Sequence, residues 1–164
     1  MKRLEQQIAF ILEIDKVKQI MRQTPLTDGN RKENDAEHSW HIALMALLLK
    51  EYAEDEVDVA KVMTMVLVHD LVEIDAGDTY AYDEAAAESK KEREQKAADR
   101  IFGILPADQG NYLRSLWDEF EAYETADAMI GTACLFIYAA KRYLAIEESE
   151  NARAIIKKLV VYSE

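Results

Sequence analysis

Apolar residues recur every three to four positions along most of the chain, which is the period of an α-helix. This spacing predicts a first helix over residues 4–21 and further helices at later positions. The further ranges are 35–52, 58 to a break at 75–78, 84–102, 108–123, 125–147 and a short helix from Ala152. No hairpin dipeptide stands between alternating strands. The predicted fold class is therefore all-α, a bundle of about six to seven helices forming a single domain over residues 1–164.

Turn residues and expected N-cap residues mark where the predicted helices begin and end. Asp35 and Asp58 stand where N-cap residues are expected, and the Thr24 to Asn30 segment is predicted as a loop. Gly77 is the natural residue for a left-handed backbone at the break after the third helix. The 84–102 helix is charged and rich in alanine, so we expect it to be mostly solvated.

Composition narrows the functional classes. The chain has 32 acidic and 20 basic residues and a net charge of −12, which disfavours binding to nucleic acid or to an anionic membrane. A single cysteine, Cys134, excludes an intramolecular disulfide and suits a reducing compartment. No apolar run approaches the roughly 18 residues of a spanning helix. We therefore expect a soluble, cytoplasmic protein.

The segment from Val62 to Val72 is almost entirely apolar, yet it contains His69 and Asp70 and is followed by Glu73. A buried carboxylate is usually paired or bound to a metal. Imidazole and carboxylate ligands suit Mn, Co, Zn, Ni or Fe, and Glu73, one turn along the helix, would remain to handle a water molecule. The alternative is a capped helix end with a core histidine that binds nothing.

His38 falls in the first turn of its predicted helix. The partial positive charge of a helix N-terminus favours the neutral, metal-binding form of histidine. His41 follows three residues later, about 60° around the helix, so a clamp made of both histidines is an open alternative.

These residues carry a resemblance. The run Glu37-His38-Ser39-Trp40, followed by His69-Asp70, Glu73 and Gly77-Asp78, resembles the HD-domain metal-dependent phosphohydrolases, specifically their 5'-deoxynucleotidase-like branch. The similarity extends from about Phe10 to Thr125 and is family-like to about residue 128. The resemblance implies that His38, His69 and Asp70 bind a divalent metal together with a later helical aspartate, and that Glu73 handles the proton of the attacking water.

The resemblance also implies a substrate site. Arg22, matched to an arginine on the first helix, would contact the substrate phosphate, and Asp78 would contact the sugar. Arg31 is a second candidate for the phosphate. Each has a plainer alternative, since Arg22 and Arg31 are also typical solvated cations and Asp78 a typical turn residue. Trp40 is expected to pack in the core.

The chain departs from the family near its C-terminal end. The last aspartate of the family follows a Glu-Thr pair by about ten residues, and that position is Leu135, which cannot bind a metal. Asp127 is the nearest carboxylate but lies about two helical turns earlier. From about Met129 the resemblance stops. Three protein ligands and a water can still form an open catalytic site.

The expected function is a metal-dependent phosphomonoesterase that releases phosphate from nucleoside or deoxynucleoside 5'-monophosphates. Leu135 prompts an alternative, a catalytically impaired nucleotide-binding or regulatory protein that lacks the fourth ligand. A purely structural helical protein is disfavoured because His38, His69, Asp70 and Glu73 occur together. The resemblance also implies a homodimer, for which the apolar helix surface at residues 135–146 is the candidate interface.

Overall fold

The computed structural model describes residues 2–26, 29–53, 55–77 and 84–144, with side chains over the same ranges apart from 84–89 and 139–144. Helices dominate it, which confirms the all-α class. The α-helices are α1 (Arg3–Ile14), α2 (Asp35–Leu49), α3 (Val59–Val68), α4 (Glu73–Ala76), α5 (Glu84–Phe102), α6 (Ala107–Ala122) and α7 (Ala126–Leu144). Three 3₁₀ helices and two strands complete it: η1 (Asp15–Gln19), η2 (Lys50–Tyr52), η3 (His69–Val72), β1 (Met21–Pro25) and β2 (Lys32–Asn34).

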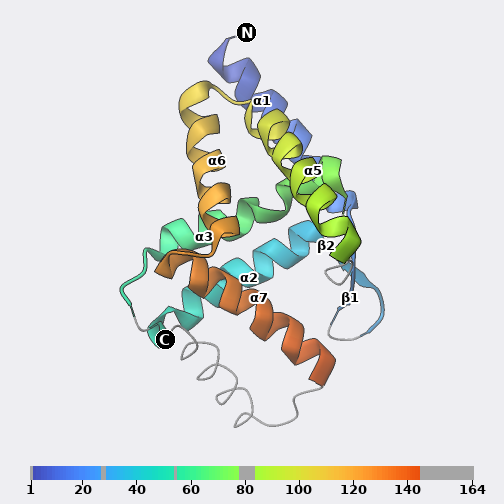
Figure 1. The fold of residues 1–164 in the computed structure, drawn as a ribbon, viewed down its shortest axis with the longest axis vertical. Coiled ribbons are helices and arrows are strands. Elements are labelled where there is room, and N and C mark those ends of the chain that lie inside the picture. Colours follow the sequence, from blue (N-terminus) through green and yellow to red (C-terminus); the bar gives the residue numbers. More distant parts are fainter. Residues whose placement is uncertain (1, 27–28, 54, 78–83, 145–164) are drawn as a thin grey trace.

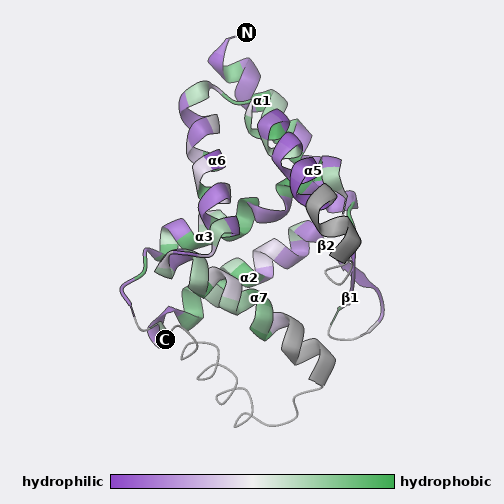
Figure 2. Cartoon of the chain, in the orientation of Figure 1, coloured by the Kyte–Doolittle hydropathy of each residue, from purple (hydrophilic) through white to green (hydrophobic). Residues whose placement is uncertain are grey.

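Two apolar clusters hold the helices together. Helices α2, α3 and α7 pack against one another in the lower part of Figure 1, with α6 joining them from above. Their cluster has Ile42, Met65, Val66 and Cys134 at its centre. The second cluster joins α5 and α6 to η3 and includes Phe102. Figure 2 shows that the coloured part of α7 is mostly apolar and that the coloured part of α5 is more hydrophilic.

The first helix is shorter than its sequence pattern predicts. It ends at Ile14, continues as η1 to Gln19, and then gives way to a strand. Strand β1 pairs antiparallel with β2, with Met21 opposite Asn34. Arg22 therefore lies on a strand, so its placement on the first helix was wrong. The hairpin escaped prediction because β1 reads Met-Arg-Gln-Thr-Pro, with no alternation of apolar and polar residues.

The N-caps of α2 and α3 fix where these two helices begin and which side chains are left for the candidate site. Asn34, not Asp35, is the N-cap of α2, accepting a hydrogen bond from the Glu37 amide at 3.0 Å. The Glu37 carboxylate accepts in return from the Asn34 amide at 3.2 Å, a capping box. The Asp35 carboxylate is thus left for other contacts. Asp58 caps α3 as predicted, accepting from the amides of the next turn.

The apolar segment that carries His69 is not one continuous α-helix. Helix α3 ends at Val68, and His69 to Val72 form the tighter 3₁₀ turn η3 before α4 begins at Glu73. Gly77 has a φ of +75°, as predicted for the break. Asp78 and the short helix predicted from Ala152 lie outside the described residues. Within the described ranges, no helix has the length and apolar character needed to span a membrane.

Candidate metal centre and phosphate site

His38, His69 and Asp70 converge at the junction of α2 and η3. Each offers one ligand atom, and these atoms all lie within 4.8 Å of one another. All three side chains are buried. The packing of α2 on α3 and η3 brings them together, although His38 is about 30 residues from the other two. The predicted set of two imidazoles and a carboxylate is therefore assembled in the folded chain.

The His69 ring is held so that one nitrogen is left for a ligand. Its Nδ1 lies 2.6 Å from the Val66 carbonyl oxygen, so Nδ1–H donates there and Nε2 carries the lone pair. Burial lowers the pKa of His69, which keeps the ring neutral. Nε2 then faces Asp70 Oδ1 at 3.0 Å. Two lone-pair atoms at this distance require a cation or a proton between them.

In the described part of the chain, the ring nitrogens of His38 are not held by hydrogen bonds as Nδ1 of His69 is. Among the described residues, neither nitrogen of its buried ring has a hydrogen-bond partner. Its ring centroid is 5.9 Å from that of His69. An unsatisfied buried polar group costs about 1–3 kcal/mol, and binding of a metal ion by one of the nitrogens would recover this cost. The residues present therefore fit a divalent transition metal.

Arg22 places a positive charge beside this cluster. Its Nη1 donates to Asp70 Oδ2 at 2.7 Å and to Asp35 Oδ1 at 3.1 Å. Burial alone would lower the pKa of Arg22, but the negative charges of Asp70, Asp35 and Glu73 together raise it above its usual value. The guanidinium is thus a permanent cation next to a metal-site carboxylate, where a phosphate group would need one.

Glu73 follows η3 directly, at the start of α4, and lies next to the same carboxylates. Its carboxyl group lies close enough to that of Asp35 to lower the pKa of Asp35 by hydrogen bonding. Burial, together with the charge of Asp70, raises the pKa of Asp35 to about 7. Two carboxyl groups in contact share a proton more readily than two isolated ones, so Glu73 stands in a setting where protons can be held and passed on.

The other predicted substrate residues lie elsewhere or cannot be placed. Arg31 donates to both carboxylate oxygens of Glu37, at 2.8 and 2.6 Å, on the exposed side of α2. Asp78 is outside the described residues.

Two other residues of α2 do not take part in the site. His41 does not belong to the group of metal-site atoms found among the described residues. Trp40 is 60% exposed, so its expected place in the core was wrong.

Helix α7 brings no described carboxylate to the cluster. Asp127 forms an ion pair with Lys61 at 3.0 Å and accepts a hydrogen bond from the Asp58 amide at 2.9 Å. Leu135 is partly buried and packs against the apolar cluster of α2, α3 and α7. A different residue of α7, Tyr138, contacts the site through the ring of His38, and the sequence pattern did not single it out.

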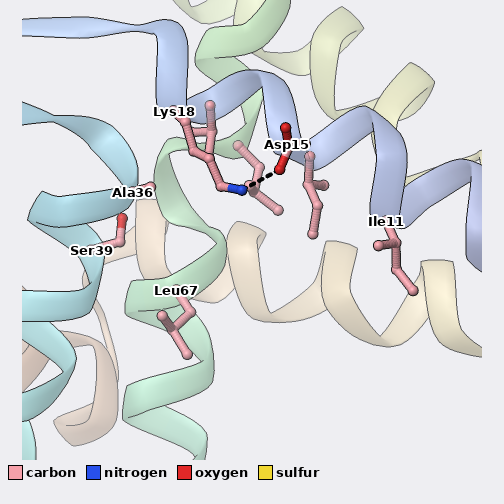
Figure 3. Close-up of a pocket in the computed structure, with 9 residues that line it drawn as sticks. Ile11, Asp15, Lys18, Ala36, Ser39 and Leu67 are labelled. Atoms are coloured by element: carbon pink, nitrogen blue, oxygen red, sulfur yellow. Dashed lines mark hydrogen bonds and ion pairs between the residues drawn. The ribbon is translucent and has the colours of Figure 1, made fainter.

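A separate cavity of about 350 Å³ lies between α1 with η1 and the α2–α3 pair, shown in Figure 3. Ile11, Leu67 and other apolar side chains line it, and the Asp15–Lys18 ion pair crosses one side. None of the three metal-site residues lines this cavity. Its apolar walls do not suit a phosphate, so it is distinct from the metal centre.

Several known proteins are similar to this chain. The 5'-deoxynucleotidase HDDC2 of Homo sapiens is 33% identical over 98 residues, which cover 60% of this chain and 47% of that protein. The Dictyostelium discoideum protein of the same name is 32% identical over 103 residues, covering 60% and 54%. The chain thus spans about half the length of these curated relatives.

A solved structure from Magnetospirillum magnetotacticum MS-1, described as a "Predicted metal-dependent phosphohydrolase", is similar over nearly the whole chain. It is 43% identical with a TM-score of 0.83, covering 96% of this chain and 95% of that one. The family model for the HD domain matches residues 14–159, so the match continues beyond Met129, where the recognised motifs end. The buried His-Asp cluster and this match together show that the chain belongs to the HD domain family.

Proposed function

We propose that the chain is a metal-dependent phosphomonoesterase acting on nucleoside or deoxynucleoside 5'-monophosphates. The observation that carries the proposal is the convergence of His38, His69 and Asp70 within 4.8 Å, with Arg22 held 2.7 Å from Asp70. The relatives called 5'-deoxynucleotidase and the structure described as a phosphohydrolase support the same reaction class.

Each residue of the site has its own role in the proposed reaction. His38, His69 and Asp70 would hold a divalent ion, which would act as a Lewis acid toward the phosphoryl oxygens and lower the pKa of a water molecule. Arg22 binds the phosphate, for which it exchanges a carboxylate contact for a phosphoryl oxygen. Glu73 accepts the proton of the attacking water. Asp78, just after Gly77, contacts the sugar, and Arg31 serves the phosphate only if it leaves Glu37.

A second candidate function is a nucleotide-binding or regulatory protein with little turnover. Leu135 favours it, because an apolar side chain packed against the core stands where a fourth ligand is expected. Losing one carboxylate weakens metal affinity and leaves more positive charge on the ion. This candidate predicts nucleotide binding without release of phosphate.

The test begins with metal content and ends with turnover. Protein purified without added ions is analysed for bound elements, then loaded in turn with Mn, Co and Zn and assayed for phosphate release from a panel of 5'-monophosphates and matching 3'-monophosphates. We expect stoichiometric metal and release from the 5' compounds only. Metal and nucleotide binding without release would favour the regulatory candidate, and absence of metal after loading would contradict both.

We also propose that the protein is a homodimer that associates through α1. Leu4, Ile8 and Ile11 form an exposed apolar stripe at helical spacing, and Leu67 lies across the adjoining cavity from Ile11 (Figure 3). Contiguous exposed apolar surface of this kind tends to be an interface. A twofold pairing would bury the same stripe on both copies.

Light scattering at micromolar concentrations tests the dimer. We expect twice the monomer mass for the parent chain and the monomer mass for Ile8→Glu, in the middle of the α1 stripe, because the charge would be buried without a partner. Phe136→Glu, on the exposed side of α7, is the matched control and should leave the dimer intact. Dissociation by the α7 change alone would instead place the interface at residues 135–146, and a monomeric parent would exclude the dimer.

A further inference from the structure

Glu33 is a carboxylate buried beside the metal centre. It is 1% exposed and lies on β2, five residues before His38. Tyr138 of α7 donates its hydroxyl to Glu33 Oε2 at 2.6 Å. On the other side, Glu33 Oε1 is 3.4 Å from His38 Nδ1. A buried carboxylate is stable only where such donors reach it, so β2, α2 and α7 meet at this group.

Tyr138 brings α7 against the histidines, and no described carboxylate of α7 joins them. Its ring packs edge-on against His38, with centroids 5.3 Å apart, and against His41 at 4.7 Å. Tyr138 follows Leu135 by three residues, about 60° around the helix. The helix therefore contacts the site through a phenol that orients a carboxylate of β2, where the family pattern expects an aspartate of its own.

The hydrogen bond of the His69 ring shows which kind of partner His38 needs if it is to bind a metal. The Val66 carbonyl takes the Nδ1 proton of His69 and so leaves Nε2 as the ligand atom. A histidine that binds metal almost always donates its other N–H to a carboxylate, a carbonyl or a water. The charged oxygen that His38 Nδ1 faces is Glu33 Oε1, at 3.4 Å, a separation that a small rotation of the ring would close to a hydrogen bond.

We propose that Glu33, held by the Tyr138 hydroxyl, is a positioning residue that fixes His38 as the Nδ1–H tautomer and so directs its Nε2 lone pair at the metal site. This rests on the metal site of the proposed function. A carboxylate acceptor also raises the basicity of the imidazole it orients. Through His38, the negative charge of Glu33 thus partly replaces the charge that an aspartate at position 135 would bring to the metal site.

The chain contains three histidines, so the ¹⁵N–¹H spectrum of its imidazoles resolves each tautomer separately. In the metal-free parent we expect both His38 and His69 as Nδ1–H tautomers. In Glu33→Gln, the Tyr138 hydroxyl donates to the amide oxygen, which leaves the amide NH₂ facing His38 Nδ1. Because Nδ1 must then accept, His38 should change to the Nε2–H tautomer, while His69 serves as the unchanged internal reference.

Zinc affinity, measured by competition with a chelator, gives the second readout. Removing a partner of this kind typically lowers metal affinity by roughly 10–100-fold, and we expect this loss in Glu33→Gln. Tyr138→Phe should give a smaller loss, since it removes only the group that holds Glu33. Glu119→Gln is the control, a partly buried carboxylate paired with Lys61 that should change neither His38 nor zinc affinity.

An Nε2–H tautomer of His38 in the metal-free parent would overturn the proposal, and that reading needs no variant to fold. An unchanged His38 tautomer and zinc affinity in a folded Glu33→Gln would overturn it as well. If Glu33→Gln does not fold, the parent spectrum and Tyr138→Phe still decide. Because the tautomer is read without metal or substrate, zinc binding without phosphate release would count against the proposed function and not against this inference.

Discussion

The double change His69→Ala with Asp70→Ala is expected to abolish metal binding and phosphate release together. It removes two of the three clustered ligands, and the single imidazole of His38 would remain. The fold should survive, because the change also removes two groups whose burial the ion compensates. Arg22 keeps Asp35 as its partner at 3.1 Å, so no isolated buried charge is left. Elemental analysis after loading with Mn or Zn, together with a thermal melt by circular dichroism, checks both parts.

His41→Ala is the matched control for this double change. His41 lies on the same helix as His38 and packs against Tyr138, but it is not part of the metal-site group found among the described residues. It should therefore retain stoichiometric metal. Loss of metal in His41→Ala would revive the two-histidine clamp on α2, and retention of metal by the double variant would rule out the site as described.

The helical pattern predicted most of the fold because the buried faces of these helices are apolar at regular spacing. The α5 range agrees with its prediction, and α2, α6 and α7 begin within one residue of theirs. The first helix failed for a physical reason, since nothing in the Asp15 to Pro25 composition signals a 3₁₀ turn followed by a strand. Arg22 was consequently assigned to the wrong element, although it still reaches Asp70.

The cluster of His38, His69 and Asp70 was predicted because a histidine and an aspartate inside an apolar segment require a reason to be there, and because the family resemblance implies that His38 joins them. Glu33, Asp35 and Tyr138 were missed because their roles depend on tertiary contacts. Glu33 and Tyr138 are 105 residues apart in sequence, and Glu33 precedes a helix start, where acidic residues are ordinary. Asp35 was predicted as a cap, but Asn34 fills that role and frees Asp35 for Arg22.

Glu73→Gln is expected to leave metal content intact and to slow phosphate release by roughly 10²–10⁴-fold, the usual contribution of a general acid or base. The change keeps the size and hydrogen bonding of the side chain but removes its ability to accept a proton. Glu73 is not among the three clustered ligands, so the ion should stay. Metal analysis and the initial rate with the best nucleotide of the panel give the two values. A rate equal to that of the parent would make Glu73 an ordinary carboxylate at the start of α4.

This prediction assumes that the parent turns over, and Leu135→Asp tests that assumption directly. If the missing ligand limits activity, an aspartate at this position should raise both metal affinity and the rate. The gain is opposed by the cost of placing a carboxylate where Leu135 packs against the apolar cluster, so the variant is best compared with Leu135→Asn, which carries the same cost without the charge. A rise in Leu135→Asp alone would identify the charge as the cause. If the parent and both variants bind metal and nucleotide but release no phosphate, the site has become a regulatory one, in which Glu73 has no proton to accept.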